Sequence, residues 1–483
     1  MEYKLDIDAI KKSYAVDEIK KTLKHNTGKR INILPYNTKY KKHKYKNSIE
    51  KFDLTVGNFS RLISCREITN NFIDDNWLDT TIKNVSADEE GTIFLKHFVK
   101  DIFFNKNSFE FFHPLIYNYI GINEKVSSFE TKNAQSADFN QKLSIFLYNI
   151  LIDSEDPEMK NLIEQVYQYQ HQNILISLVI KALPPLRQTE RQKKQSYKSC
   201  FDFVKSLFIE DFKFMLSDSN LFLNNFEIVL KYYYFFYVSQ LSLKFRDQLS
   251  MNVTKPEPLY FTLEWESTGR SRTSYNSGWK YLSGAIQQLF SHANCLELLN
   301  HTTSNTGSYS YHELSEVVKN MSQTEIGELK KDLQSLIELY IKCVNDVEWR
   351  DFHRNEKYEN EIYNAIYELF SRIDFQFNNS SRKEMYNYYM MWFEEFCKIN
   401  FLKQRGQLGY TLNLSEEYLI VITKLCIKNN DKIRLKLLFN EYERRGIYFD
   451  KDSKKRIVQL FEKLNLIEKK SDSGDAQYVK FIL

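Results

Sequence analysis

The stretch YFDKDSKKRIVQLFEKLNLIEKKSDSGDAQYVKFIL, residues 448–483, decides how the carboxyl-terminal part of this chain folds. Asp450 or Asp452 is a suitable helix N-cap, and the apolar side chains that follow recur at helical spacing. After LIEKK, the polar break SDSGD is followed by AQYVKFIL, in which apolar positions alternate. The pattern predicts a helix and then two short strands around a turn. The inward side chains of the helix are Ile457, Leu460, Phe461 and Leu464.

Two further helices are predicted before this stretch. Ser415 is a good N-cap for the first, which has an apolar face that begins at Tyr418 and Leu419. The second runs from about Ile433 to Arg445 and stops at Gly446, because glycine is the residue that most readily ends a helix in a left-handed conformation. Three helices and a hairpin, with a short connection between the second and third helix, predict a winged helix-turn-helix domain over residues 403–483.

The third helix of such a domain can lie in the major groove of DNA, while the hairpin reaches the adjacent backbone. Side chains opposite the apolar stripe would then face the nucleic acid. Gln459 is the candidate for base recognition, and the lysines and arginines are candidates for phosphate contacts. Glu462 lies on the same face and counts against tight insertion. The candidate DNA-binding residues are Lys455, Arg456, Gln459, Lys463, Lys469 and Lys470.

The same small fold also serves as a protein-interaction module, and the fold alone does not distinguish the two uses. Charge favours DNA. Residues 403–483 carry 17 Lys and Arg against 11 Asp and Glu, residues 1–51 carry 14 against 6, and the remaining middle carries 36 against 46. Basic charge at both ends of an acidic body is suited to a polyanion, although asymmetry of this size also arises by chance.

Composition predicts a mainly α protein. Only 13 Gly and 7 Pro interrupt 483 residues, and 42% of residues are hydrophobic. We divide the chain into a basic N-terminal helix and arm (1–51), a helical body (52–254), a second helical region after a Pro/Ser/Gly-rich loop (255–402) and the winged-helix domain (403–483). The helices expected before the last domain are Ile7 to Lys24, Asp138 to Asp153, Glu158 to Leu183, Leu221 to Asp247, and one that begins with a capping box formed by Ser322 and Glu325.

The segment from Lys24 to Lys46 contains eight Lys and Arg, no acid, and the tyrosines Tyr36, Tyr40 and Tyr45. It is suited either to phosphates with stacked bases or, more commonly, to a solvated basic loop.

Arg270 and Arg272 project from the loop at residues 255–279 and form a weak candidate anion site, with pairing to acids of the body as the alternative.

Catalytic and metal sites are poorly supported. No glycine-rich phosphate loop occurs, and we expect no cofactor. His292, Cys295 and His301 do not share one helical face, so a zinc site is not expected. A nuclease would need converging carboxylates. Glu264 and Glu266, which would share one face of a strand, are the only weak candidates, because Glu210 to Lys213 reads as a solvated helix face. We therefore expect a protein that is not an enzyme.

The six cysteines are well separated, which predicts reduced thiols in the cytoplasm, and we expect no secretory leader. The most apolar stretch, residues 232–243, is too short to span a bilayer, so no membrane association is expected.

Two regions resemble the DptG family of DNA phosphorothioation-dependent restriction proteins. They are LEWESTGRSRTSYNSGWKYLSGAIQQLFSHANCLELLNH, residues 263–301, and LKQRGQLGYTLNLSEEYLIVITKLC, from residue 402, running on to LNLIEKKSDSGDAQYVKFIL. The resemblance implies a bacterial antiviral defence role, in a complex with DptF-like and DptH-like subunits that restricts DNA lacking the sulfur-modified backbone. It also implies that the ATPase motifs belong to those partners. No functional residue is carried over from the family.

Overall fold

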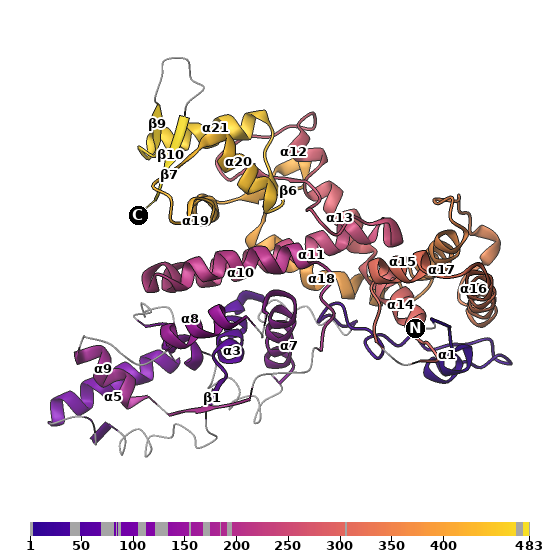
Figure 1. Cartoon of the computed structure of the whole chain (residues 1–483), viewed down its shortest axis with the longest axis horizontal. Coiled ribbons are helices and arrows are strands. Elements are labelled where there is room, and N and C mark those ends of the chain that lie inside the picture. The colour runs from indigo at the N-terminus through magenta and orange to yellow at the C-terminus, as the bar shows by residue number, and fades with distance from the viewer. Residues whose placement is uncertain are drawn as a thin grey trace.

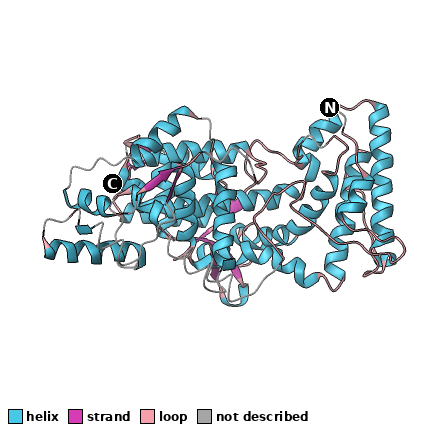
Figure 2. Ribbon diagram, turned by 90° about the horizontal axis from the view of Figure 1, so that it is seen from below, coloured by secondary structure: helices cyan, strands magenta, loops and turns pink. Residues whose placement is uncertain are grey.

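A computed structural model describes residues 3–38, 49–68, 82–83, 85, 88–104, 113–120, 134–153, 156–167, 174–183, 185–190, 196–304, 307–469 and 477–482. The described chain is mainly helical, with a few short strands, which confirms the prediction of a mainly α protein (Figure 2). Helices α10 (Asp202–Leu216) and α11 (Ser219–Phe245) cross the middle of the molecule, with the C-terminal helices on one side and the helices of the first half on the other (Figure 1).

Helix α11 is the central element of the core. Asp218 caps it by accepting hydrogen bonds from two backbone N–H groups, and almost every side chain from Tyr232 to Phe245 is buried. A helix that is apolar on all sides has to be covered by other elements on all sides. The elements of the first half are α3 (Phe52–Ser64), β1 (Arg66–Ile68), α5 (Glu89–Phe104), η2 (Pro114–Tyr119), α7 (Ala134–Leu151), α8 (Pro157–Tyr167), α9 (Ile174–Ala182) and β2 (Leu186–Gln188).

The second half continues this core. Helix α16 (Gln323–Cys343) begins with the predicted capping box, in which the Ser322 and Glu325 side chains each accept from the backbone of the other. Its apolar stripe is buried against α17 (Glu361–Asn379). The other helices here are α12 (Thr273–Asn276), α13 (Trp279–Gln287), α14 (Leu289–Leu299), α15 (Tyr311–Lys319) and α18 (Lys383–Asn400).

The N-terminal segment packs on this second half. Helix α1 (Ile7–Ser13) precedes a loop whose backbone N–H groups at residues 28–31 donate to the buried Glu297 carboxylate of α14, at 2.9–3.4 Å. The helix predicted from Ile7 to Lys24 is thus wrong in its length. Asp17 accepts from the backbone N–H groups of Ile19 and Lys20, and this local turn competes with helix continuation.

The C-terminal unit, residues 415–482, contains three helices and a small sheet. The helices are α19 (Glu416–Ile427), capped by Ser415 as predicted, α20 (Leu435–Arg444) and α21 (Lys451–Lys463). Strand β10 (Gln477–Lys480) pairs antiparallel with β7 (Lys432–Arg434) on one side and β9 (Ile467–Lys469) on the other. The strand order is therefore β7-β10-β9, and β7 occupies residues expected to begin the second helix.

Short strands join this unit to the preceding region. Strand β3 (Leu259–Tyr260) pairs parallel with β8 (Ile447–Tyr448), and β4 (Thr262–Leu263) pairs parallel with β6 (Tyr410–Leu414), which also pairs with β5 (Leu402–Gln404). One continuous apolar cluster runs from Tyr3 to Val479. The C-terminal unit is therefore built into the core of the chain.

Candidate nucleic-acid interface

Helix α21 presents a polar face to solvent. Asp450 caps it by accepting from the Ser453 backbone N–H at 3.1 Å, and Ile457 and Phe461 are fully buried. The opposite face is exposed, as the helical projection requires. Four sequence-predicted residues lie exposed on this helix, namely Lys455, Arg456, Gln459 and Lys463.

These four side chains are available for contact. The Arg456 guanidinium donates to Gln459 Oε1 at 3.2 Å, so the two lie side by side. Lys455, Arg456 and Lys463 form no ion pair within the described part of the chain. Lys451, one turn before Lys455, is also exposed and was missed by the sequence analysis, although its position on the polar face was visible there.

The hairpin residues are placed differently. Lys469 is exposed at the end of β9, and its ammonium group pairs with the Glu462 carboxylate at 2.8 Å. The acid that counted against groove insertion is therefore partly neutralised by the hairpin lysine. Lys470 lies outside the described residues. Strand β7 contributes the exposed Arg434, whose guanidinium lies over the Tyr478 ring and donates to its hydroxyl.

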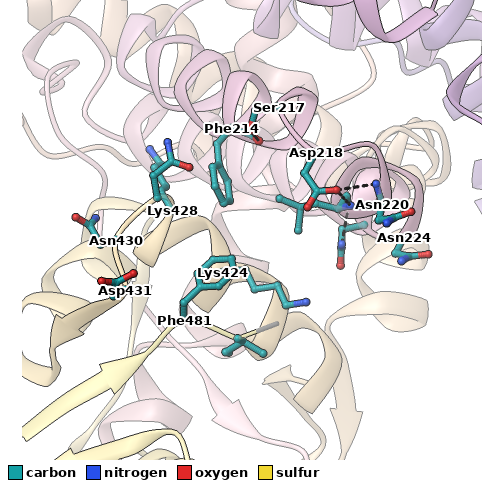
Figure 3. Close-up of a pocket in the computed structure, with 14 residues that line it drawn as sticks. Phe214, Ser217, Asp218, Asn220, Asn224, Lys424, Lys428, Asn430, Asp431 and Phe481 are labelled. Carbon is teal, nitrogen blue, oxygen red and sulfur yellow. Dashed lines mark hydrogen bonds between the residues drawn. The ribbon is translucent and has the colours of Figure 1, made fainter. Parts of the chain in front are cut away.

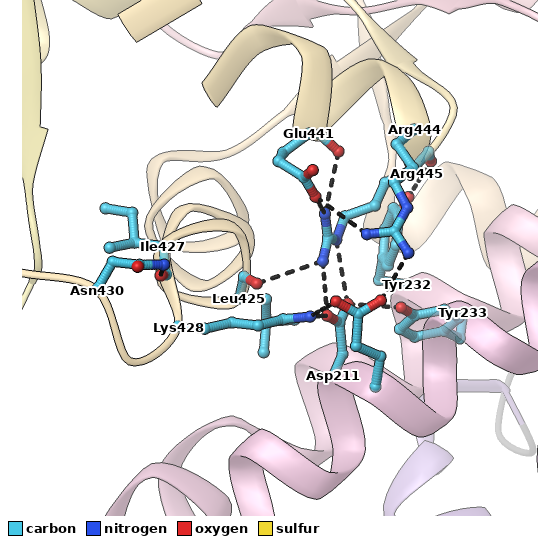
Figure 4. A network of polar contacts seen from close by, with 11 residues as sticks. Asp211, Tyr232, Tyr233, Leu425, Ile427, Lys428, Asn430, Glu441, Arg444 and Arg445 are labelled. Carbon is cyan, nitrogen blue, oxygen red and sulfur yellow. Dashed lines mark hydrogen bonds and ion pairs between the residues drawn. The ribbon is translucent and has the colours of Figure 1, made fainter. Parts of the chain in front are cut away.

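The C-terminal unit is fixed to the helical body by a buried ion pair (Figure 4). Arg445, which follows α20, donates to both carboxylate oxygens of Asp211 on α10, at 2.6 and 3.1 Å, and both side chains are fully buried. Tyr233 donates to the same carboxylate at 2.6 Å, and Tyr232 donates to the Arg445 carbonyl oxygen. The interpretation of Glu210 to Lys213 as a solvated face is thus wrong at Asp211.

Glu210, next to Asp211 on α10, is half-exposed and binds two cations at the edge of this buried pair. Its carboxylate accepts from Arg444 at 2.6 Å and from Lys428. Partial burial by itself would raise the pKa of Glu210, but these two cations outweigh burial and lower the pKa to about 2. Arg444, Arg445 and Lys428 therefore serve the internal junction rather than the exposed face.

Of the two weak anion-site candidates, Arg272 is engaged with acids. Its guanidinium contacts both Asp450 carboxylate oxygens, Glu266 Oε1 at 3.2 Å and Ser453 Oγ at 2.9 Å. Burial would raise the pKa of Asp450, but the hydrogen bonds from Arg272 and the backbone hold it well below its usual range. The alternative, pairing with acids of the body, is thus correct for Glu266, whereas Asp450 belongs to the C-terminal unit. Arg270, in contrast, is exposed.

The weak nuclease candidates do not share a face. Strand β4 ends at Leu263, Glu264 is exposed, and Glu266 is only 4% exposed. Burial raises the pKa of Glu266. Within the described residues, no group of three or more His, Cys, Asp or Glu is placed to hold a metal ion. The expectation that these two carboxylates lie on one strand face is therefore wrong.

The histidines set aside as zinc ligands lie in the core. His292 is within 3.1 Å of the Tyr311 hydroxyl and stacks on Phe370, and His301 Nδ1 lies 2.8 Å from the Glu297 carbonyl oxygen.

Within the basic N-terminal segment, the structure places one of the three tyrosines proposed to stack on bases in the core. Tyr36 is buried, and its hydroxyl lies 2.6 Å from that of Tyr234 on α11. The hypothesis that Tyr36 stacks on bases is wrong, because its ring is part of the core. Tyr40 and Tyr45 lie outside the described residues.

A cavity of about 560 Å³ lies where the α10–α11 turn faces the α19–β7 turn (Figure 3). It is lined by Phe214 and Phe481 and by several polar side chains, including Lys424, Asn220 and Asn224. Asp218 and Asn430 at its edge are used locally, Asp218 as the α11 cap and Asn430 as a donor to the Ile427 carbonyl oxygen.

The sequence matches no known protein-family model and no curated protein. In the part of the chain that the structure describes, no helix combines the length and apolar character needed to cross a bilayer. The exposed face of α21 and its surroundings are therefore the candidate functional site.

Proposed function

We propose that this chain is a non-catalytic accessory subunit that engages double-stranded DNA through a C-terminal winged helix-turn-helix. The elements run in the order α19, β7, α20, β8, α21, β9 and β10; β8 pairs with β3 outside the unit, and the unit's own sheet has the strand order β7-β10-β9. This arrangement supports the winged-helix assignment, with α21 as the recognition helix and β9–β10 as the wing.

The observation that carries the proposal is the exposed face of α21. Lys455, Arg456 and Lys463 stand free of ion pairs among the described residues, and Gln459 lies between them on the same face. Lysine and arginine recognise phosphate, and a glutamine side chain can pair with an adenine edge in the major groove.

We further propose, from the resemblance to DptG, that the subunit works in the bacterial cytoplasm in a phosphorothioation-dependent restriction system. DptF-like and DptH-like subunits would be its ATPase partners. The absence of a phosphate-binding loop in the sequence is consistent with ATP chemistry residing in other subunits.

The experiment is a fluorescence anisotropy titration of the full chain with duplex DNA. The full chain is needed because the Arg445–Asp211 pair and the pairing of β8 with β3 join the C-terminal unit to the rest of the chain. Affinity should fall steeply with salt, and Lys455→Glu with Arg456→Glu should weaken it at least tenfold at 50 mM salt. The matched control is Arg350→Glu with Lys383→Glu, two exposed cations on the second helical region. No affinity of the wild type at 50 mM salt would reject the proposal.

One observation favours protein contact by the same unit as a second candidate. Leu437 on α20 and Leu464 at the end of α21 are exposed large apolar side chains, at 49% and 41%. If the unit is an adaptor, Leu437→Ser with Leu464→Ser should abolish co-purification with DptF-like or DptH-like subunits while DNA binding is unchanged. Retained co-purification would reject the adaptor role.

A further inference from the structure

The loop of residues 264–272 is attached to the N-terminal end of α21. Arg272 reaches the capping residue Asp450 at 3.0 Å through Nε, and the Ser453 hydroxyl donates to Glu266 Oε1 at 2.8 Å. The loop is also held from behind, because Arg405 donates to the backbone carbonyl oxygens of Glu266 and Leu263 at 2.6 and 2.9 Å. These bonds therefore hold the loop and the first turn of α21 together as one rigid unit.

The opposite end of α21 leads into the β9–β10 hairpin. The Lys469–Glu462 ion pair joins the hairpin to the last turn of the helix. In Figure 1 the hairpin strands, α21 and the region of α12, which follows the loop, lie along one edge of the molecule. Helix α21 has 13 residues, so the two attachments are separated by about 20 Å along its axis.

This separation along the helix would let its two ends reach the two phosphate backbones that border a major groove. A helix inserted in the major groove, which is about 12 Å wide, has a phosphate backbone on each side. The hairpin would approach one backbone, so an element at the other end of the helix is in position for the second. Among the described residues, the Asp450 and Ser453 side chains at that end bond to Phe261, Glu266, Arg272 and Ser274, a segment that includes the loop of residues 264–272.

The loop offers a cation at this point. Arg270 is exposed and makes no ion pair within the described residues, while its carbonyl oxygen accepts from Asn276 at 2.9 Å, which fixes the backbone at its base. Lys451, the first residue of α21, is exposed next to the same junction. Trp265, 42% exposed, adds a large planar side chain to the loop.

We propose that Arg270 is a phosphate-contacting residue on a second flank of the DNA interface, and that Arg272 is the positioning residue that attaches this flank to the recognition helix. The inference rests on the proposed DNA-binding function of α21. It assigns different roles to two arginines that are equivalent in the sequence, because one faces solvent and the other faces Asp450 and Glu266.

The test measures duplex affinity of the full chain across a salt series. Arg270→Ala should lower affinity several-fold at 150 mM salt and reduce the slope of log K against log salt by about 0.9, the value for one phosphate contact on B-DNA. Arg350→Ala is the matched control, since Arg350 is 81% exposed at a remote 3-10 turn, and it should change neither quantity. Arg270 is exposed, so its replacement should leave the thermal unfolding temperature unchanged.

The outcomes separate the two proposals. If the wild type does not bind duplex DNA, the proposed function fails and this inference falls with it. If Lys455→Glu with Arg456→Glu weakens binding but Arg270→Ala leaves affinity and salt slope at wild-type values, the second flank is overturned while the proposed function stands.

The positioning role of Arg272 is tested by measuring the effect of Arg270→Ala on affinity in the presence of Arg272→Ala. With Arg272→Ala the loop loses its attachment, so adding Arg270→Ala should produce a much smaller further loss of affinity than it does in the wild type. A purely structural role would lower thermal stability but leave the full Arg270 effect in place, which would overturn the positioning role.

Discussion

Arg445 and Asp211 form an ion pair in which neither side chain is exposed to solvent, across 234 residues of sequence. Burial alone would favour a neutral arginine, but the Asp211 charge keeps the pKa of Arg445 well above its ordinary value. The pair is satisfied by Tyr233 and by the Leu425 carbonyl oxygen. The junction between the helical body and the C-terminal unit is thus polar at its centre and closed to water.

Removing one partner should be costly. Asp211→Asn leaves the buried Arg445 with only Glu441 as an acidic partner, and Arg445→Met leaves the buried Asp211 with only Lys428 as a cation, so we expect a loss of up to about 3–5 kcal/mol in the free energy of unfolding. Replacing both by apolar residues should cost less than the sum of the single changes, because no isolated charge remains. Urea denaturation followed by circular dichroism measures this. Additive losses would contradict the coupling, and the control Lys383→Met, at an exposed position, should change stability by less than about 0.5 kcal/mol.

Gly446, directly after Arg445, should not tolerate a side chain. Its φ is +74°, and a Cβ there would lie 2.5 Å from the ring of the buried Phe236 on α11. Gly446→Ala combines left-handed strain with overpacking, so we expect a loss of about 2–4 kcal/mol by urea denaturation. Gly28→Ala is the control, because φ is +76° there and an added Cβ would make only ordinary contacts, at 3.6 Å or more, with the Asn32 side chain. Equal losses at the two positions would show that the contact with Phe236 is not significant.

Features fixed by a few neighbouring residues could be predicted from the sequence. The caps at Ser415, Asp450 and Ser322 were correct, because each depends on a side chain and backbone groups two or three residues away. The polar face of α21 also followed from helical periodicity, although Leu464, which was predicted to face inward, is 41% exposed at the end of the helix.

Features that depend on distant partners were missed. Strand β7 is three residues long, and only its pairing with β10, more than forty residues later, distinguishes it from the start of a helix. Asp211 resembles a surface acid until Arg445 is placed against it. Arg270 and Arg272 have the same local sequence character, and only the fold separates them.

His25 belongs to a closed ring of hydrogen bonds. Arg382 donates to His25 Nδ1 at 2.7 Å and to Asp346 at 2.8 Å, and Gln376 donates to the same carboxylate at 2.8 Å. Tyr340 completes the ring, lying 2.9 Å from His25 Nε2 and donating to Gln376 Oε1. Because arginine only donates, His25 Nδ1 must accept, and the imidazole is neutral.

Stability should therefore decline in acid. Burial, and then the Arg382 charge, lower the pKa of His25 to about 3. The unfolded state, with an ordinary histidine pKa of about 6.5, binds a proton that the folded state does not bind, so stability is lost as pH falls from about 6.5 toward 3. The expected contribution is about 1.4 kcal/mol per pH unit.

The measurement compares wild type with His25→Phe by urea denaturation between pH 7 and pH 4. The difference isolates His25 from the carboxylates and the other buried histidines that titrate in both proteins. The free energy of unfolding of the variant should fall less steeply as pH decreases, and the difference in slope should correspond to about one bound proton. Identical slopes would show that His25 is protonated in the folded state.

Glu462 should restrain DNA binding. It pairs with Lys469 on the hairpin and places a negative charge on the face proposed to meet phosphate. Glu462→Gln removes that charge and frees Lys469, so affinity for duplex DNA should rise several-fold at 50 mM salt, with a steeper salt dependence. Stability should change by less than about 1 kcal/mol, because the pair is half-exposed.

Glu359→Gln, the same change at an exposed position on the second helical region, should leave affinity unchanged. Unchanged affinity for Glu462→Gln would place this end of α21 outside the interface, and equal gains in the two variants would trace the effect to net charge rather than to contact.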